Sequence, residues 1–176
     1  MKFGFSIFPL LGYPSSLIEA ARKAEEVGFE SLYTPDHLLF PMEMPSTYPY
    51  AADGRSPVRS GEGPRFDAWA LLSHLAAVTK TIRLGTNVYI LPLRDPLAVA
   101  RSVATLDQLS DGRTLFGVGV GWLEQEFEMI GRDFRTRGAV TDEAIAFLRQ
   151  VWTQPVTAFN GKHLSYPPIK MEPKPI

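Results

Sequence analysis

The sequence predicts an α/β fold in which parallel strands alternate with helices. Apolar segments with the pattern of a strand followed by a helix begin near residues 2, 29, 82 and 114. Once an irregular segment at 38–65 is set aside, these units recur about every 30 residues, as βα units in a parallel sheet do. A doubly wound sheet and a TIM-type (β/α)8 barrel share this repeat, but a barrel needs about 250 residues. As a barrel, the 176-residue chain would supply only the N-terminal half, about four βα units plus a hairpin.

Composition indicates a single globular domain over residues 1–176. The chain is 45% hydrophobic and 21% charged with a formal net charge of −1, so nothing favours nucleic acid or a membrane surface as a partner. No cysteine is present, which excludes disulfides and thiolate chemistry. The first residues lack the apolar core of a signal peptide, and no run approaches the roughly 18 apolar residues of a membrane span. We therefore expect a cytoplasmic location.

The first two strands frame one helix. Residues 2–8 are rich in aromatic side chains, which favours a strand. Ser15 or Ser16 is the expected N-cap of a helix that runs to Val27. The second strand, 29–34, leads directly into Pro35, Asp36 and His37.

The segment 38–65 has neither helical nor strand periodicity. Its prolines and glycines indicate an irregular excursion, and so long a loop in a compact domain is typically a lid or a binding loop. Its aromatic and basic side chains could cover a ligand or lie in solvent; they are Tyr48, Tyr50, Arg55, Arg59 and Arg65. We predict a lid-like insertion.

Helices and two further strands occupy the rest of the chain. Asp67 is placed to open a buried helix through Thr79, and Asp95 caps a helix that ends at Ser110. The inward face of that second helix should carry Val99, Val103, Leu106 and Leu109. The expected strands are 82–91 and 114–118, the later helices are 123–130 and 141–152, and a hairpin over 155–166 turns at Asn160 and Gly161.

Glycines at alternating positions follow the fourth strand. Because strand side chains alternate between two faces, Gly117, Gly119 and Gly121 leave one face bare. A flat ligand could lie on that face, or the strand could pass through a crowded corner. The run is not the G-x-G-x-x-G dinucleotide fingerprint.

In either parallel architecture, ligands bind beyond the carboxyl ends of the strands. His37 is the one histidine expected there, where it could act as a general acid or base. We expect His74 to be a core residue, His163 to lie on the surface, and Glu124, Glu126 and Glu128 to form a solvated face. The spacing of the three histidines indicates no metal site.

Several motifs together resemble the N-terminal part of the luciferase-like monooxygenase superfamily, in the branch of probable coenzyme F420-dependent oxidoreductases. The motifs are Phe3-Gly4-Phe5, Asp36-His37-Leu38, Leu84-Gly85-Thr86-Asn87-Val88 before Pro92-Leu93-Arg94-Asp95-Pro96, and the run from Thr105 through Gly121-Trp122-Leu123. The resemblance covers essentially the whole chain and implies a (β/α)8 barrel that holds a flavin or a deazaflavin.

The resemblance also implies roles for individual residues. His37, with Asp36 beside it, would be catalytic and handle a proton next to the cofactor ring. Asn87 and Val88 would form a bulge with a cis peptide bond behind the ring, and Gly119, Val120 and Gly121 would contact the ring. Trp122 stands where the sugar-phosphate dehydrogenases carry a catalytic glutamate, which argues against a sugar-phosphate substrate.

Three functions follow as hypotheses. The first is hydride transfer between coenzyme F420 and a small organic substrate. The second is an FMN-dependent luciferase-like monooxygenase. The third is a truncated, catalytically silent relative that acts as a binding or assembly subunit. An open half-barrel exposes strand edges, which also predicts a homo-oligomer such as a dimer.

Overall fold

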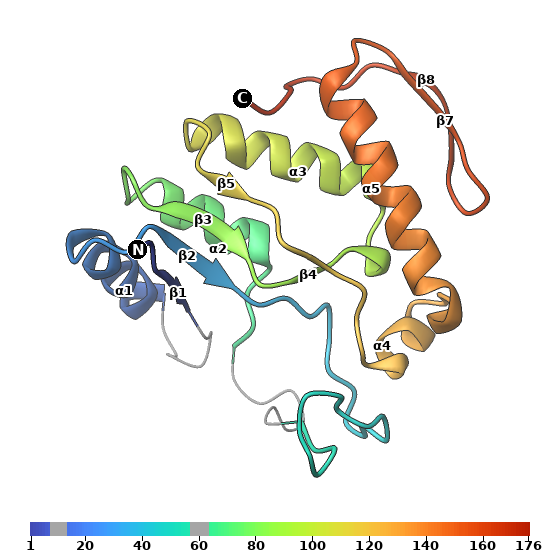
Figure 1. Cartoon of the computed structure of the whole chain (residues 1–176), viewed down its shortest axis with the longest axis horizontal. Helices are drawn as coiled ribbons and strands as arrows, with labels where there is room; N and C mark the ends of the chain where they lie inside the picture. Colours follow the sequence, from blue (N-terminus) through green and yellow to red (C-terminus); the bar gives the residue numbers. More distant parts are fainter. Residues whose placement is uncertain (8–13, 57–63) are drawn as a thin grey trace.

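The computed structural model describes residues 1–7, 14–56 and 64–176. Its centre is a parallel sheet in the order β1-β2-β3-β5, with helices between successive strands (Figure 1). These elements are β1 Gly4–Ser6, α1 Pro14–Glu26, β2 Ser31–Thr34, α2 Ala68–Ala76, β3 Arg83–Thr86, α3 Pro96–Leu109 and β5 Thr114–Leu115. The predicted parallel α/β organisation is therefore confirmed.

The third and fourth strands differ from the prediction because each is interrupted. The first break falls at Asn87 and Val88, whose peptide bond is cis, as the resemblance implies. Beyond the breaks, β4 Tyr89–Ile90 pairs in parallel with β6 Val118–Gly119. The carbonyl of Gly117 joins the two parts, since it accepts from the Thr86 hydroxyl at 2.8 Å and from the Tyr89 amide at 2.8 Å.

The last part of the chain adds two helices and a hairpin. They are α4 Glu124–Met129, α5 Arg137–Thr153, β7 Thr157–Asn160 and β8 Ser165–Ile169, with short 3-10 turns η2 Leu91–Leu93 and η3 Phe134–Thr136. Helix α5 begins before the predicted residue 141. The predicted turn at Asn160 and Gly161 is wrong, because Asn160 ends β7 and pairs with Ser165, so that residues 161–164 form the turn.

Two of the predicted helix caps are confirmed. The Asp67 side chain accepts from the amide of Ala70 at 2.9 Å, and that of Asp95 accepts from the amide of Leu97 at 2.9 Å. The expected cap at Ser15 or Ser16 is wrong, because α1 already begins at Pro14 and contains both serines.

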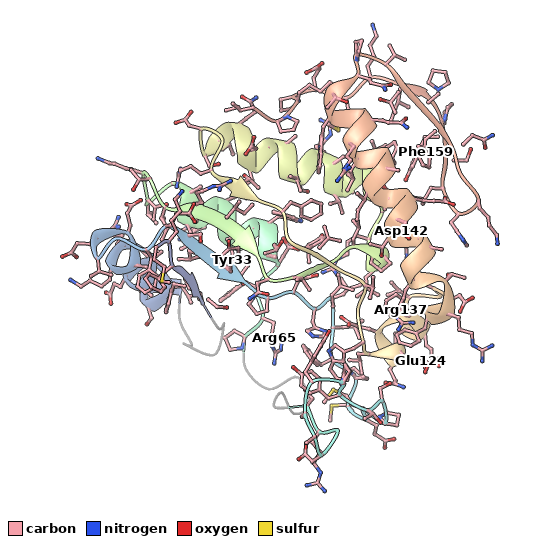
Figure 2. All side chains as sticks on the ribbon, in the orientation of Figure 1. Tyr33, Arg65, Glu124, Arg137, Asp142 and Phe159 are labelled. Atoms are coloured by element: carbon pink, nitrogen blue, oxygen red, sulfur yellow. The ribbon has the colours of Figure 1, made fainter. Side chains whose placement is uncertain are left out.

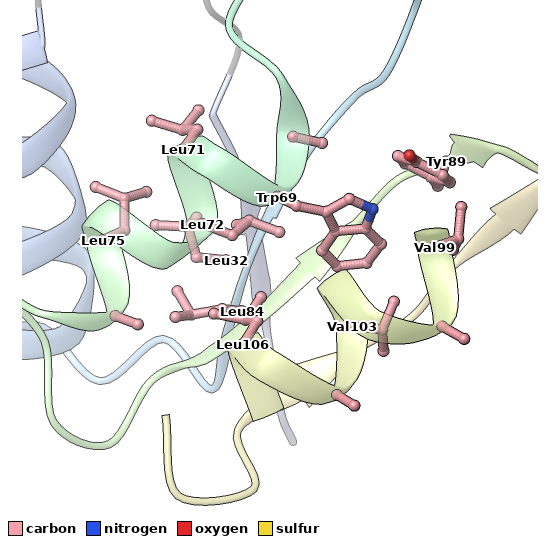
Figure 3. Close-up of a cluster of buried hydrophobic side chains, with 14 of the residues drawn as sticks. Leu32, Trp69, Leu71, Leu72, Leu75, Leu84, Tyr89, Val99, Val103 and Leu106 are labelled. Carbon is pink, nitrogen blue, oxygen red and sulfur yellow. The ribbon is translucent and has the colours of Figure 1, made fainter. Parts of the chain in front are cut away.

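Apolar side chains from the strands and from α2 and α3 form the core (Figure 3). Leu32 and Leu84 are fully buried in the sheet, and the Trp69 indole from α2 lies 5.1 Å from the Tyr89 ring, between centroids. Two predicted inward residues are exceptions. Leu109 is 68% exposed because it ends α3, and His74 is exposed on the outer face of α2, so its predicted core position is wrong. Within the described residues, no helix is both long and apolar enough to cross a membrane.

The carboxylate of Glu25 joins α1 to the start of the third strand. One of its oxygens accepts from the amides of Lys80, Thr81 and Ile82 at 2.8, 2.6 and 2.9 Å. Burial alone would raise the pKa of this carboxyl, but the hydrogen bonds outweigh burial and lower the pKa to about 2. The ionised form is therefore favoured in the folded chain.

Replacing Glu25 with glutamine should lower the free energy of unfolding by about 1–2 kcal/mol at pH 7, because charge-assisted hydrogen bonds are lost. The carboxyl's usual pKa is 4.5 and its folded pKa is about 2. Its stabilisation is thus complete above pH 4.5 and disappears as the pH falls toward 2. Urea unfolding at several pH values checks this, with the exposed Glu19→Gln on the same helix as the control. A difference between variant and parent that does not shrink on acidification would contradict it.

Candidate active site

A pocket of about 310 Å³ lies at the carboxyl ends of the parallel strands. All of the site residues predicted from the sequence line it: Asp36, His37, Asn87, Val88, Gly119, Val120 and Gly121. They come from the exits of β2, β3 and β6, which are far apart in the sequence but meet at one edge of the sheet. This is the edge at which ligands bind in parallel α/β folds.

His37 is held in the pocket by a carboxylate from α4. Its Nδ1 lies 2.9 Å from Oε2 of Glu126, and the other oxygen of Glu126 accepts from the amides of Leu38 and Leu39 at 2.6 and 3.2 Å. An ionised carboxylate can only accept hydrogen bonds, so Nδ1 carries the proton. Nε2 has no hydrogen-bond partner in the part of the chain that the structure describes.

The expectation that Glu126 is solvated is wrong, because its side chain is 0% exposed. Glu128 is exposed and Glu124 is half-buried. A signal for this was present in the sequence: residues two apart on a helix point in nearly opposite directions. Three alternating glutamates therefore cannot share one solvated face, and the middle one points inward.

Asp36 is engaged on both of its oxygens. Oδ1 accepts from Nη2 of Arg94 at 2.7 Å, and Oδ2 accepts from the amide of Ile90 at 3.0 Å. Burial raises the pKa of Asp36 above its usual range, although the Arg94 guanidinium and the Ile90 amide oppose this rise. These contacts tie the exit of β2 to β4 and so fix the backbone that carries His37.

The excursion after β2 lies beside the pocket and contacts α4 (Figure 1). Ser46 donates to the Gln125 side chain at 2.8 Å, and the Tyr48 ring meets Trp122 edge-on with centroids 5.0 Å apart. Tyr48 and Tyr50 both line the pocket. Within 38–56 and 64–65 there is no helix or strand, as expected, whereas Arg59 and the rest of 57–63 lie outside the described residues. That the segment moves as a lid stays a prediction.

The structure supports the crowded-corner interpretation of the glycine run, because a Cβ at Gly121 would meet the Ile90 and Phe127 side chains. That a flat ligand lies on this stretch stays a prediction. A Cβ at Gly117 would meet the Thr86 carbonyl oxygen, and one at Gly119 would meet the Val88 side chain, so the strands are too close for larger residues. Gly121, at φ +82, also lines the pocket. Arg137 at the start of α5 donates to the Gly121 carbonyl at 3.1 Å and holds this turn in place (Figure 2).

Replacing Gly117 with alanine should lower the free energy of unfolding by about 1–3 kcal/mol, because the added methyl group meets backbone and strands β3 and β5 would have to separate. Gly138→Ala is the matched control, since a Cβ there meets nothing within 4 Å and alanine favours the helix. Thermal unfolding compares the two. Equal stability of the two variants would show that the strands accommodate the methyl group.

The walls of the pocket suit a flat, partly apolar ring system. Val88 and Val120 are 42% and 43% exposed and present aliphatic side chains to the pocket, while Tyr48 and Trp122 add aromatic walls. Asn87 contributes a polar side chain near the rim. Within residues 1–7, 14–56 and 64–176, no three histidine or carboxylate side chains are grouped to hold a metal ion.

Comparison with known proteins gives a family match over the whole chain. The family described as luciferase-like monooxygenase matches residues 1–176. An uncharacterized protein of Mycobacterium tuberculosis is 35% identical over 161 residues, which cover 89% of this chain and 55% of that protein. The F420-dependent glucose-6-phosphate dehydrogenase of Amycolatopsis mediterranei is 32% identical over 179 residues, 99% of this chain and 49% of the enzyme. The chain spans about half the length of these curated relatives.

Solved structures share the same fold. Monooxygenase RslO1 from Streptomyces bottropensis superposes with a TM-score of 0.80 at 26% identity, over 99% of this chain and 50% of that one. An F420-dependent secondary alcohol dehydrogenase in complex with an F420-acetone adduct gives 0.74 at 26% identity, with the same coverage of 99% and 50%. The FMN complex of the oxygenating constituent of 3,6-diketocamphane monooxygenase, from a Pseudomonas putida plasmid, gives 0.72 at 20%, over 94% and 43%.

Proposed function

The chain belongs to the luciferase-like monooxygenase family, and we propose that it serves hydride transfer between coenzyme F420 and a small organic substrate. The observation that carries this proposal is the His37–Glu126 pair, at 2.9 Å, on a pocket whose other walls are Val88, Val120 and the glycine turn. The likeness to F420-dependent dehydrogenases supports the choice of cofactor.

When bound, F420 would accept or supply the hydride, and the protein would orient it and manage the proton. In this proposal Val88 and Val120 would lie against the ring, Gly119 and Gly121 would line the same wall, and Asn87 would bond the polar edge of the ring. Tyr48 and Trp122 exclude water from the opposite side. The pocket residues fit this role because their exposed surface is mainly aliphatic and aromatic.

The proton would be exchanged at Nε2 of His37. Because Glu126 fixes the proton on Nδ1, Nε2 can accept the proton of a substrate hydroxyl while a hydride leaves the adjacent carbon. In the opposite direction the imidazolium returns that proton to a carbonyl oxygen. The Glu126 carboxylate balances the positive charge that forms on the ring. Asp36, bonded to Arg94 and Ile90, acts in this scheme as a positioning residue.

An FMN-dependent monooxygenase is the second candidate. The solved structure with the highest TM-score given above, 0.80, is a monooxygenase, and the aliphatic and aromatic pocket walls fit a flavin ring as well as a deazaflavin ring. The same His37–Glu126 pair would then control the proton on an oxygenated substrate.

Titration of the 176-residue chain with F420 and with FMN, followed by the absorbance of each ring, tests the proposal. We expect micromolar binding with a spectral shift, and tighter binding of F420. Tighter binding of FMN would favour the monooxygenase. A folded chain that binds neither would contradict both and leave the binding or assembly subunit as the function.

A further inference from the structure

Arg65 is a cation at the pocket with no counter-ion among the described residues. It lies on the return from the excursion, just before the Asp67 cap of α2 (Figure 2). Within the described residues it forms no ion pair, and its buried Nε has no hydrogen-bond partner. Its guanidinium carbon lies 4.2 Å from the centre of the Phe40 ring. In the part of the chain that the structure describes, packing against Phe40 thus holds the guanidinium in place and no anion balances its charge.

Other charged groups nearby have their own partners. Arg94 is paired with Asp36 at 2.7 Å, and the Glu126 carboxylate accepts from the His37 ring at 2.9 Å and from the amides of Leu38 and Leu39. Asp67 caps α2 through its Oδ1 and forms no ion pair with Arg65. Burial lowers the pKa of Arg65, which is the direction expected for a cation that has lost water and gained no anion.

A second hollow of about 420 Å³ adjoins the pocket at this cation. His37 and Arg65 line both hollows, while Phe40, Arg94 and the helix-capping Asp67 line the second. Arg94 contributes a further buried nitrogen, Nη1, that has no partner among the described residues. The His37 and Arg65 groups both lie against the Phe40 ring, at 4.4 and 4.2 Å from its centre. One small molecule can therefore contact both the His37 ring and the Arg65 guanidinium.

We propose that the hollow between Arg65 and Arg94 binds the anionic group, a carboxylate or phosphate, of the molecule whose reacting part lies at His37. A guanidinium recognises the two oxygens of such a group through paired hydrogen bonds, and a partly desolvated guanidinium does so strongly. The proposal rests on the proposed function only in taking that molecule to be the substrate. It assigns the substrate class as small organic acids or phosphate esters.

Benzoate and benzamide are the probes for a substrate carboxylate, because they share shape and differ in charge. Calorimetric titration of the 176-residue chain should show benzoate binding about tenfold or more tightly than benzamide. Arg65→Gln should reduce that preference to within about twofold, and Arg65→Lys should keep part of it. Arg55→Gln, an exposed arginine of the same excursion, is the matched control and should leave it unchanged.

A second experiment compares the binding of FMN and riboflavin to the parent and to Arg65→Gln, because the two molecules differ only in the phosphate. If Arg65→Gln weakens benzoate alone, the anion bound in this hollow is the substrate's, as proposed. If it weakens FMN but not riboflavin, the anion is the cofactor's phosphate, and the assigned substrate class is overturned. The proposal is also overturned if neither ratio changes in Arg65→Gln. Unchanged ratios in a chain that still binds F420 or FMN would leave the proposed function standing, whereas Arg65-dependent benzoate binding by a chain that binds neither cofactor would remove the proposed function and keep this site.

Discussion

Replacing His37 with asparagine is expected to lower kcat by about 10²–10⁴-fold, the usual contribution of a general acid or base. The asparagine Nδ2 can still donate to Glu126, so the neighbouring backbone bonds of Leu38 and Leu39 to that carboxylate remain. What is lost is Nε2, the atom with no partner in the described part of the site. Steady-state assays that follow F420 absorbance with an accepted alcohol or ketone measure the effect.

The affinity of His37→Asn for the cofactor shows whether a fall in kcat comes from the lost proton-transfer group or from a damaged pocket. The Kd for F420 or FMN should stay within about threefold of the parent, because the ring-side walls at Val88 and Val120 are untouched. Unchanged turnover in the asparagine variant would remove His37 from the reaction. A matching loss of cofactor affinity would instead make it a structural residue.

Glu126→Gln is expected to lower kcat by about 10–100-fold with little change in KM, as loss of a group that orients a catalytic side chain does. Glutamine keeps the oxygen that accepts from Leu38 and Leu39 but presents an NH2 group to Nδ1. The imidazole then has to accept at Nδ1 and carry its proton on Nε2. The position that exchanges with the substrate is therefore in the wrong state, and the carboxylate that balanced the imidazolium is gone.

Nitrogen-15 NMR shows which ring nitrogen of His37 carries the proton, and it requires no substrate. The proton should lie on Nδ1 in the parent and on Nε2 in Glu126→Gln. Glu126→Ala should in addition lower the free energy of unfolding by about 2–4 kcal/mol, because buried amide donors lose their acceptor. The same tautomer in parent and glutamine variant would show that Glu126 does not set the state of the ring.

The sequence predicted which residues line the pocket better than it predicted where strands break and helices end. Repeating βα units determine which strand exits meet, so the placement of His37, Asn87 and Gly119 at one pocket followed from topology. Periodicity did not reveal the break inside the third strand, because apolar residues continue on both sides of Asn87 and Val88. Helix ends are similarly uncertain, as at Ser15 and Leu109, since several nearby residues could serve as the terminus.

The partners of the site residues were not predictable from local patterns. Glu126 is 89 positions from His37, and Arg94 is 58 from Asp36. Such contacts depend on the tertiary path of the chain, and charged residues are on average exposed. That Arg65 has no ion pair among the described residues also depends on the tertiary structure and could not be predicted from the residues around it. Only the physical impossibility of three glutamates on one helix face hinted at a buried carboxylate.

The two sides of the pocket differ in how freely they can change during evolution. His37 is held by Glu126 and by the β2–β4 contacts of Asp36, so drift there disturbs the fold as well as the reaction. Tyr48 and Tyr50 stand on irregular backbone, and Tyr50 is 80% exposed. Substitutions at these tyrosines change the shape of the accepted molecule at small cost to folding. They are the positions at which a directed-evolution library would diversify substrate range while the proposed proton-transfer pair, His37 and Glu126, is left unchanged.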